Sequence, residues 1–149
     1  MLVGEACNRE VVVVDKEAAT KVAIGLMRDY HVGDVVVVED RLGQQIPIGI
    51  LTDRDVVVEL LAEDVDLDAV SVGDIMSYEL QVAREGDELT NTIKKMKHKG
   101  IRRLPVVNEQ GGLVGILTLD DIIEIMAELM GDLASLVKKE QKKEKKTRK

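Results

Sequence analysis

A short motif of glycine, threonine and aspartate occurs twice in this chain, with the spacing Gly-apolar-apolar-Thr-x-x-Asp at residues 49–55 and 115–121. If a helix begins at the threonine, its first backbone N–H groups are free to bind an anion such as phosphate. The threonine hydroxyl can donate to a phosphate oxygen, and the aspartate carboxylate can accept from two neighbouring ribose hydroxyls. The motif therefore suits a ribose-phosphate group, and its candidate ligand-binding residues are Gly49, Thr52 and Asp55 in one copy and Gly115, Thr118 and Asp121 in the other.

The same spacing is close to that of a capping box, which needs no ligand. In a capping box the threonine hydroxyl accepts from the backbone three residues on, and the acidic residue there bonds back. Such a cap stabilises a helix by about 1 kcal/mol. The glycines, which lack Cβ, admit either a ligand or a neighbouring strand close to the backbone. Spacing alone leaves both interpretations open, and they do not exclude each other.

The two motifs belong to a longer internal repeat. A shift of 69 positions places residues 3–7 on residues 72–76, and residues 35–38 on residues 104–107. After Asp40 the offset falls to 66, because the first copy carries three more residues in the following loop. A length change confined to a loop is typical of a structural duplication. The repeat predicts two equivalent sites, or one site and its relic.

Each copy predicts the order strand, helix, strand, strand, helix. Short valine-rich runs predict buried strands, and apolar residues at helical spacing predict helices. One unit of about 60 residues buries little surface alone, so we expect an α/β fold of the α+β type, with two pseudo-symmetric β-α-β-β-α repeats packed sheet to sheet. The expected strands are 10–14, 35–38, 48–51, 80–83, 104–107 and 113–117, and the expected helices are 18–30, 52–62, 88–99 and 120–130, the last ended by Gly131.

This pattern divides the chain into a first repeat (1–64), a linker (65–71), a second repeat (72–131) and a Lys-rich extension (132–149). The segment between the repeats is acidic, and we expect it to be exposed. The extension begins with apolar residues at helical spacing and then becomes a Lys and Glu run. It either prolongs the last helix or is disordered.

Composition narrows the function classes. Hydrophobic residues make up 45% of the 149 residues, yet the chain has no Phe or Trp and only two Tyr, so the core must be aliphatic. RNA recognition by stacking of bases on aromatic side chains is disfavoured. Eight basic and two acidic residues give positions 138–149 a charge of +6, which leaves −13 for the rest of a chain whose net charge is −7. The acidic body disfavours nucleic-acid binding except through the Lys-rich tail.

Several catalytic and membrane classes find no support in the sequence. Cys7 is the single cysteine, which fits a reducing compartment. No signal peptide is evident, and no apolar run approaches the roughly 20 residues of a transmembrane segment. We expect a cytoplasmic protein. No catalytic triad order, P-loop, dinucleotide fingerprint or metal-ligand set is evident, so we expect no catalytic residues, metal or catalytic cofactor.

Three motifs together resemble the cystathionine β-synthase (CBS) domain: the repeated Gly-apolar-apolar-Thr-x-x-Asp segment, residues 101–108 (IRRLPVVN) and residues 72–77 (VGDIMS). Two tandem copies resemble a CBS pair, or Bateman module, over about residues 2–131. The resemblance implies a regulatory, non-catalytic protein. It also implies adenosine-containing ligands, such as AMP, ADP, ATP or S-adenosylmethionine, bound in clefts between the two sheets.

The resemblance also implies roles for particular residues. The motif aspartates, Asp55 and Asp121, would hold the ribose, and the threonines, Thr52 and Thr118, would reach phosphate. The first copy departs from the pattern because it has Gly-Asp where the second has two arginines, and an acid repels phosphate. We therefore expect unequal sites. The adenine would lie among the aliphatic residues of 12–14 and 80–82, which include Val13 and Val82, and Arg102 and Arg103 are candidates for phosphate contact.

The resemblance further implies a homodimer joined through helices, for which the aliphatic faces of residues 56–61 and 122–130 are candidates. An alternative is an interaction module for a separate enzyme, transporter or transcription factor, in which the motifs are only helix caps. The Lys-rich tail is open to three interpretations: a solubilising end, a contact with nucleic acid or an anionic membrane, or a contact with an acidic partner subunit.

Overall fold

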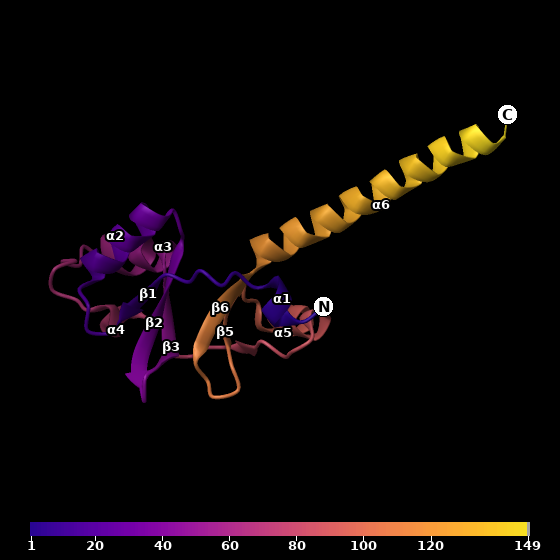
Figure 1. The fold of residues 1–149 in the computed structure, drawn as a ribbon. Coiled ribbons are helices and arrows are strands. Elements are labelled where there is room, and N and C mark those ends of the chain that lie inside the picture. The colour runs from indigo at the N-terminus through magenta and orange to yellow at the C-terminus, as the bar shows by residue number, and fades with distance from the viewer. Residues whose placement is uncertain (149) are drawn as a thin grey trace.

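Two three-stranded sheets with the same topology form the centre of the computed structural model, which describes residues 1–148 (Figure 1). In each sheet the first strand runs parallel to the middle strand, and the middle strand is antiparallel to the third. A register shift follows Val37 in one sheet and Val106 in the other, 69 positions apart. The predicted fold class is confirmed. The strands are β1 (Val13–Asp15), β2 (Asp34–Arg41), β3 (Gln44–Thr52), β4 (Ala83–Arg84), β5 (Arg103–Val107) and β6 (Leu113–Thr118).

The helices include two that the periodicity did not predict. Both are single turns, α1 (Val3–Ala6) and α4 (Val72–Ile75), too short to show an amphipathic pattern. The helix expected over 52–62 is a short α-helix that continues as a π-helix. Only parts of the runs 10–14 and 80–83 pair as strands. The remaining helical elements are α2 (Thr20–Tyr30), α3 (Asp53–Asp55), the π-helix η1 (Val56–Leu61), α5 (Leu89–Lys99) and α6 (Leu119–Thr147).

The two single-turn helices cross between the repeats. Val3 of α1 is fully buried in the core of the second repeat, and Val72 of α4 is fully buried in the core of the first. The chain after each helix bonds to the other repeat's sheet: Asn8 and Ile116 exchange two backbone hydrogen bonds of 2.9 Å. Figure 1 shows α1 beside α5 and α4 beside the first sheet. The repeats therefore form one intertwined module, as predicted.

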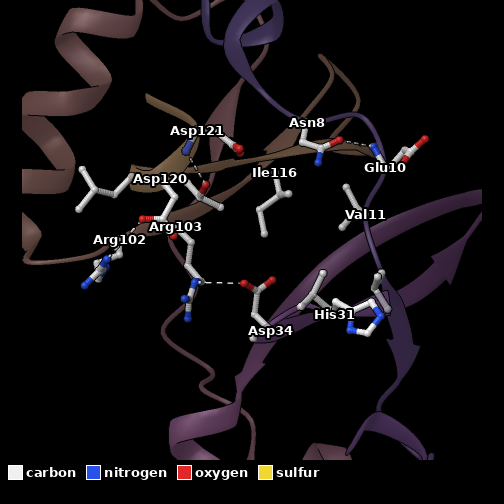
Figure 2. A pocket seen from close by; sticks show the side chains of 15 residues that line it. Asn8, Glu10, Val11, His31, Asp34, Arg102, Arg103, Ile116, Asp120 and Asp121 are labelled. Atoms are coloured by element: carbon white, nitrogen blue, oxygen red, sulfur yellow. Dashed lines mark hydrogen bonds and ion pairs between the residues drawn. The ribbon is translucent and has the colours of Figure 1, made fainter. Parts of the chain in front are cut away.

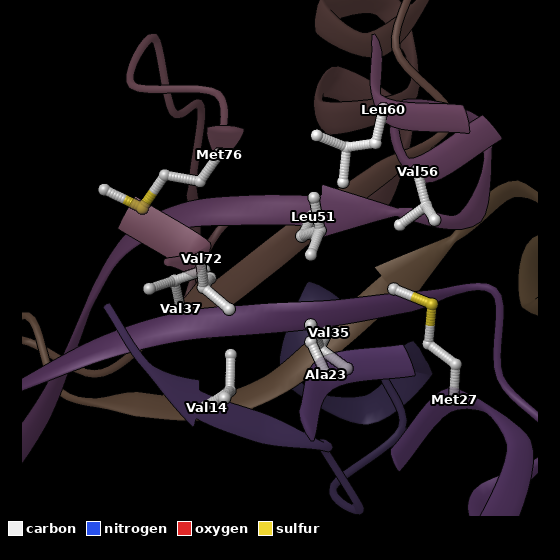
Figure 3. Close-up of a cluster of buried hydrophobic side chains, with 10 residues drawn as sticks. All are labelled: Val14, Ala23, Met27, Val35, Val37, Leu51, Val56, Leu60, Val72 and Met76. Carbon is white, nitrogen blue, oxygen red and sulfur yellow. The ribbon is translucent and has the colours of Figure 1, made fainter. Parts of the chain in front are cut away.

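The core is built from aliphatic and methionine side chains, as the lack of Phe and Trp requires. Val35 and Val37 face the first repeat's own core, whereas Val36 and Val38 face the second sheet and meet Ile116. This alternation follows from the two-residue period of a strand. It explains the valine run, because both faces of β2 are buried. The first core, shown in Figure 3, comprises Val14, Ala23, Met27, Val35, Val37, Leu51, Val56, Leu60, Val72 and Met76.

The acidic segment between the repeats is not uniformly exposed, which corrects the expectation for it. Val65, Leu67 and Val70 are half-buried against the first core, whereas the acidic residues between them face solvent. The Val70 carbonyl accepts a 2.9 Å hydrogen bond from the buried Thr20 hydroxyl. Apolar residues between acids let this segment cover the core while it keeps its charges in water.

The last helix extends well beyond the expected segment 120–130, and of the two alternatives left open for the Lys-rich extension the structure has the helical one. The prediction that Gly131 ends it is wrong, since α6 continues through this glycine to Thr147. A glycine inside a helix costs only about 1 kcal/mol relative to alanine, and the flanking residues are strong helix formers. Figure 1 shows α6 projecting away from the two sheets. None of the helices in residues 1–148 has the length and apolar character needed to cross a bilayer.

Candidate functional site

A cleft of about 320 Å³ lies between the two repeats, at the N-terminus of α6 (Figure 2). This inter-repeat cleft brings together four predicted ligand-binding residues, Arg102, Arg103, Thr118 and Asp121. Its opposite wall comes from the first repeat, from residues 10–12 before β1 and from residues 31–34, which run from the end of α2 to the first residue of β2. The volume lies at the lower end of the range for small-molecule sites.

The two Thr-x-x-Asp motifs differ in what their carboxylates do. In the first copy the capping box is closed: Thr52 N donates to Asp55 Oδ2 at 3.0 Å, and Asp55 N donates to Thr52 Oγ1 at 3.1 Å. In the second copy Asp121 N donates to Thr118 Oγ1 at 3.1 Å. Within residues 1–148, however, no hydrogen bond engages the Asp121 carboxylate. The capping interpretation accounts for the first copy, whereas the second leaves a carboxylate free to meet a ligand.

Asp34 and Arg103 form an ion pair across the inter-repeat cleft, with Oδ2 3.2 Å from Nε (Figure 2). The Asp34 side chain is 17% exposed and that of Arg103 is 31% exposed. Burial raises the pKa of Asp34 and outweighs the lowering by Arg103, and the charges of Asp53 and Asp121 raise it further. Arg103 Nε is buried and makes no well-directed hydrogen bond to any residue of 1–148. The pair is therefore held by charge, and it places a carboxylate directly beside the Arg103 guanidinium.

Arg102 lies at the rim of the inter-repeat cleft. Its guanidinium is 3.6 Å from Asp120, and both side chains are largely exposed, so the ion pair is weak. Figure 2 shows Arg102 pointing away from the pair formed by Arg103 and Asp34. The Arg102 carbonyl accepts a 2.8 Å hydrogen bond from the Leu119 N–H, which holds the start of α6 beside β5.

Other predicted residues lie outside the inter-repeat cleft. Asp55 lines a different cleft, with Met76, Ser77 and Tyr78. Thr52 lines neither of these two clefts. The predicted residues of the two motifs therefore do not form two equivalent sites of the same composition.

Gly49 and Gly115 admit neighbouring chain segments. A Cβ on Gly49 would lie 2.5 Å from Met76 Sδ, and one on Gly115 would lie 2.7 Å from Cys7 Sγ. The two crossing segments after α4 and α1 therefore account for the need for glycine. Cys7 packs against the second core, and burial raises the pKa of its thiol, which fits a small hydrophobe rather than a nucleophile.

Only one end of the aliphatic run expected at residues 12–14 reaches the inter-repeat cleft. Val11 and Val12 line the inter-repeat cleft, whereas Val13 packs between the sheets near Val36. Val82 lies outside this cleft, and its carbonyl accepts a 3.0 Å hydrogen bond from Lys95. The sequence reasoning missed several first-repeat residues that line the cleft. Of these residues, only Asp34 could have been found from the sequence, because it is an acid at the position where the second copy has Arg103. The others are Asn8, Glu10, Val11, His31 and Val32.

A metal site is not evident in this part of the molecule. Within residues 1–148, no three or more His, Cys, Asp or Glu side chains are grouped so as to hold a metal ion. The groups that the inter-repeat cleft presents to a ligand are carboxylates, guanidinium groups, the N-terminus of α6 and an aliphatic wall.

Known proteins resemble the chain over most of its length. The family model described as CBS domain matches residues 3–62 and 72–128. The uncharacterized protein MK0525 of Methanopyrus kandleri is 36% identical over 138 residues, which cover 92% of this chain and 68% of that protein. The glycine betaine/carnitine/choline transport ATP-binding protein OpuCA of Bacillus subtilis is 31% identical, over 87% of this chain and 32% of that protein.

Among solved structures, the CBS domain pair of protein MJ0100, in complex with 5′-methylthioadenosine and S-adenosyl-L-methionine, has a TM-score of 0.74. It is 20% identical and covers 86% of this chain and 97% of that one. This similarity concerns the fold. The two three-stranded sheets and their helices are thus the arrangement found in that domain pair.

Proposed function

This chain belongs to the CBS-domain family, and we propose that it is a regulatory, non-catalytic protein that binds an adenosine-containing ligand in the inter-repeat cleft. The observation that carries this proposal is the free Asp121 carboxylate, which lies beside the start of α6 in a cleft that also holds Thr118 and Arg103. A carboxylate of this kind can accept from both hydroxyls of a ribose.

The rest of the cleft supports a nucleoside. Val11, Val12 and Ile116 offer an aliphatic surface for a purine ring. The Leu119 and Asp121 N–H groups already donate to Arg102 and Thr118, so the remaining first-turn N–H groups of α6 and the Thr118 hydroxyl would face polar groups attached to the ribose. The candidate ligands are AMP, ADP, ATP and S-adenosylmethionine, and the MJ0100 complex supports the adenosine class.

Signalling would follow from the position of α6. The helix starts at the inter-repeat cleft and then projects from the sheets for most of its 29 residues. A ligand that prefers one placement of the α6 N-terminus would shift the population toward that placement. The far end of α6 would carry the change to a partner.

The proposed partner is a second copy of this chain, packed along α6. This helix exposes an apolar stripe that includes Met126, Leu129, Leu133 and Leu136. The intervals of three and four residues are those of a coiled-coil seam. The first half of α6 is acidic and the second half is rich in lysine. Two antiparallel copies would therefore bury the stripe and oppose unlike charges.

Calorimetry tests the ligand proposal directly. The full chain is titrated with AMP, ADP, ATP and S-adenosylmethionine, and a thermal melt is recorded with each ligand, since a ligand that binds the native state raises the melting temperature. We expect binding of at least one ligand with one molecule per cleft. Absence of heat and of a melting shift with all four at millimolar concentration would rule out the adenosine proposal.

A second candidate function is an interaction module for a separately encoded protein. The match to a transport ATP-binding protein, of which the chain spans about a third, favours this alternative, as do the exposed apolar residues Val57, Val58 and Leu61 on η1. In that case both Thr-x-x-Asp motifs act only as helix caps, and none of the four ligands shifts the melting temperature.

A further inference from the structure

The inter-repeat cleft contains more negative than positive charge. Its lining has four carboxylates and two guanidinium groups, which leaves a net charge of −2 when His31 is neutral. Each guanidinium already has a carboxylate partner, Asp34 for Arg103 and Asp120 for Arg102. Each guanidinium that a phosphate group could contact in the cleft therefore already has a carboxylate beside it. The four acidic residues are Glu10, Asp34, Asp120 and Asp121.

Asp34 is the acid that decides whether a phosphate group is attracted or repelled in the cleft. The exposed carboxylate of Asp120 is well screened by water, but the Asp34 side chain is only 17% exposed and lies against the deeper of the two arginines. A phosphate that approached Arg103 would also approach Asp34. Repulsion between like charges is poorly screened at such a buried position. Moving Asp34 aside would leave a buried carboxylate without its partner.

The same arrangement is compatible with uncharged and cationic nucleosides. Ribose hydroxyls donate hydrogen bonds, and the free Asp121 carboxylate accepts them without a change in charge. A positively charged group on the 5′ side of the sugar would be attracted by a cleft of net negative charge. A neutral thioether would escape the repulsion that a phosphate meets.

We propose that Asp34 is a specificity-determining residue that places a carboxylate beside Arg103 and makes the inter-repeat cleft select nucleosides with a neutral or cationic 5′ group over AMP, ADP and ATP. This inference rests on the proposed function, because it names the ligand class for the same cleft. It predicts a preference for 5′-methylthioadenosine and S-adenosylmethionine over the phosphorylated adenosines.

The test is calorimetry of the full chain with 5′-methylthioadenosine, S-adenosylmethionine, AMP and ATP. We expect the first two to bind the unaltered protein at least about tenfold more tightly than ATP, a difference of roughly 1.4 kcal/mol. The substitution Asp34→Asn should raise the affinity for ATP about tenfold and leave that for 5′-methylthioadenosine within about threefold. Asp68→Asn is the matched control, since it removes one acid of the linker at an exposed site outside the cleft.

The outcomes separate the two proposals. Tighter binding of ATP or AMP than of 5′-methylthioadenosine by the unaltered protein would overturn the selectivity inference and leave the adenosine proposal standing. An unchanged ATP affinity in a folded Asp34→Asn protein would also overturn it. Failure of all four compounds to bind would overturn both proposals. Since the unaltered protein alone gives the selectivity ratio, the test does not depend on the folding of the variant.

Discussion

Asp34 and Arg103 occupy equivalent positions of the two repeats, 69 residues apart, and their side chains form an ion pair 3.2 Å long. Equivalent residues can meet in this way only where the axis that relates the repeats passes between them. Because one copy has an acid where the other has an arginine, these two side chains attract each other, whereas two identical charges would repel. The same reversal makes the inter-repeat cleft asymmetric, because one arginine and one acid now face each other across it.

The first prediction compares the two motif aspartates. Asp121→Asn should weaken ligand binding about tenfold or more, because a free carboxylate that can accept two ribose hydroxyls is lost. Asp55→Asn should leave affinity within about twofold and instead destabilise the fold by about 1 kcal/mol, because its carboxylate closes the capping box. Calorimetry and urea unfolding of both proteins measure the two effects. A loss of affinity in the Asp55 variant alone would mean that the other copy binds.

The second prediction concerns pH. The pKa of Asp34 is raised by burial above its ordinary value of 3.8, so the native protein binds this proton more readily than the unfolded chain does. The ionised carboxylate therefore destabilises the fold at pH values above its raised pKa. The penalty is relieved as the pH falls through the raised pKa toward 3.8.

Urea unfolding of the unaltered protein and of Asp34→Asn, at pH 7 and at pH 4, close to the ordinary pKa, checks this sign. We expect the unaltered protein to gain stability relative to the variant at the lower pH, because the other titrating groups are common to both proteins. The neighbouring charges are those of Arg103, Asp53 and Asp121. A relative loss of stability at pH 4 would show that attraction to Arg103 outweighs burial.

The third prediction concerns the glycines of the two motifs. Gly49→Ala should destabilise the fold by about 1–3 kcal/mol, because its Cβ would lie 2.5 Å from Met76 Sδ and 2.9 Å from the Ser77 carbonyl oxygen. Gly25→Ala is the control: it lies within α2, and apart from its chain neighbours and the local helix backbone no atom lies within 4 Å of the added Cβ. That substitution should stabilise by up to about 1 kcal/mol. Equal effects of the two substitutions in denaturant unfolding would contradict the close approach of the crossing segment.

The fourth prediction concerns association through α6. Light scattering should give a particle of twice the 16.4 kDa chain mass at micromolar concentrations. Leu133→Asp should shift it to the monomer, because the charge lies in the middle of the apolar stripe. Val22→Asp, at an exposed apolar position on α2, is the control and should leave the mass unchanged. If the unaltered protein is a monomer at about 100 μM, the helix does not pair with a second copy.

Much of the architecture followed from local patterns. The valine runs have the length and β-branching of buried strands, and β2 indeed buries both of its faces. The length change after Asp40 was expected in a loop, and this expectation is wrong: the added residues lengthen β2 and β3, which only residues 42–43 connect, whereas residues 108–112 connect β5 and β6. Hydrophobic periodicity did not predict the single-turn helices α1 and α4, because each is too short to show a helical repeat.

The sequence by itself therefore determined the duplication, the strand and helix order and the pair of Thr-x-x-Asp turns, because each depends on residues close together in the chain. Only the tertiary structure decided which aspartate is free. Asp55 and Asp121 have the same local spacing, yet one carboxylate closes its cap and the other lines the inter-repeat cleft. It also decided that Arg103 meets Asp34 rather than an open site. Contacts between residues 69 positions apart depend on how the repeats cross, and that crossing is set by packing of the whole core.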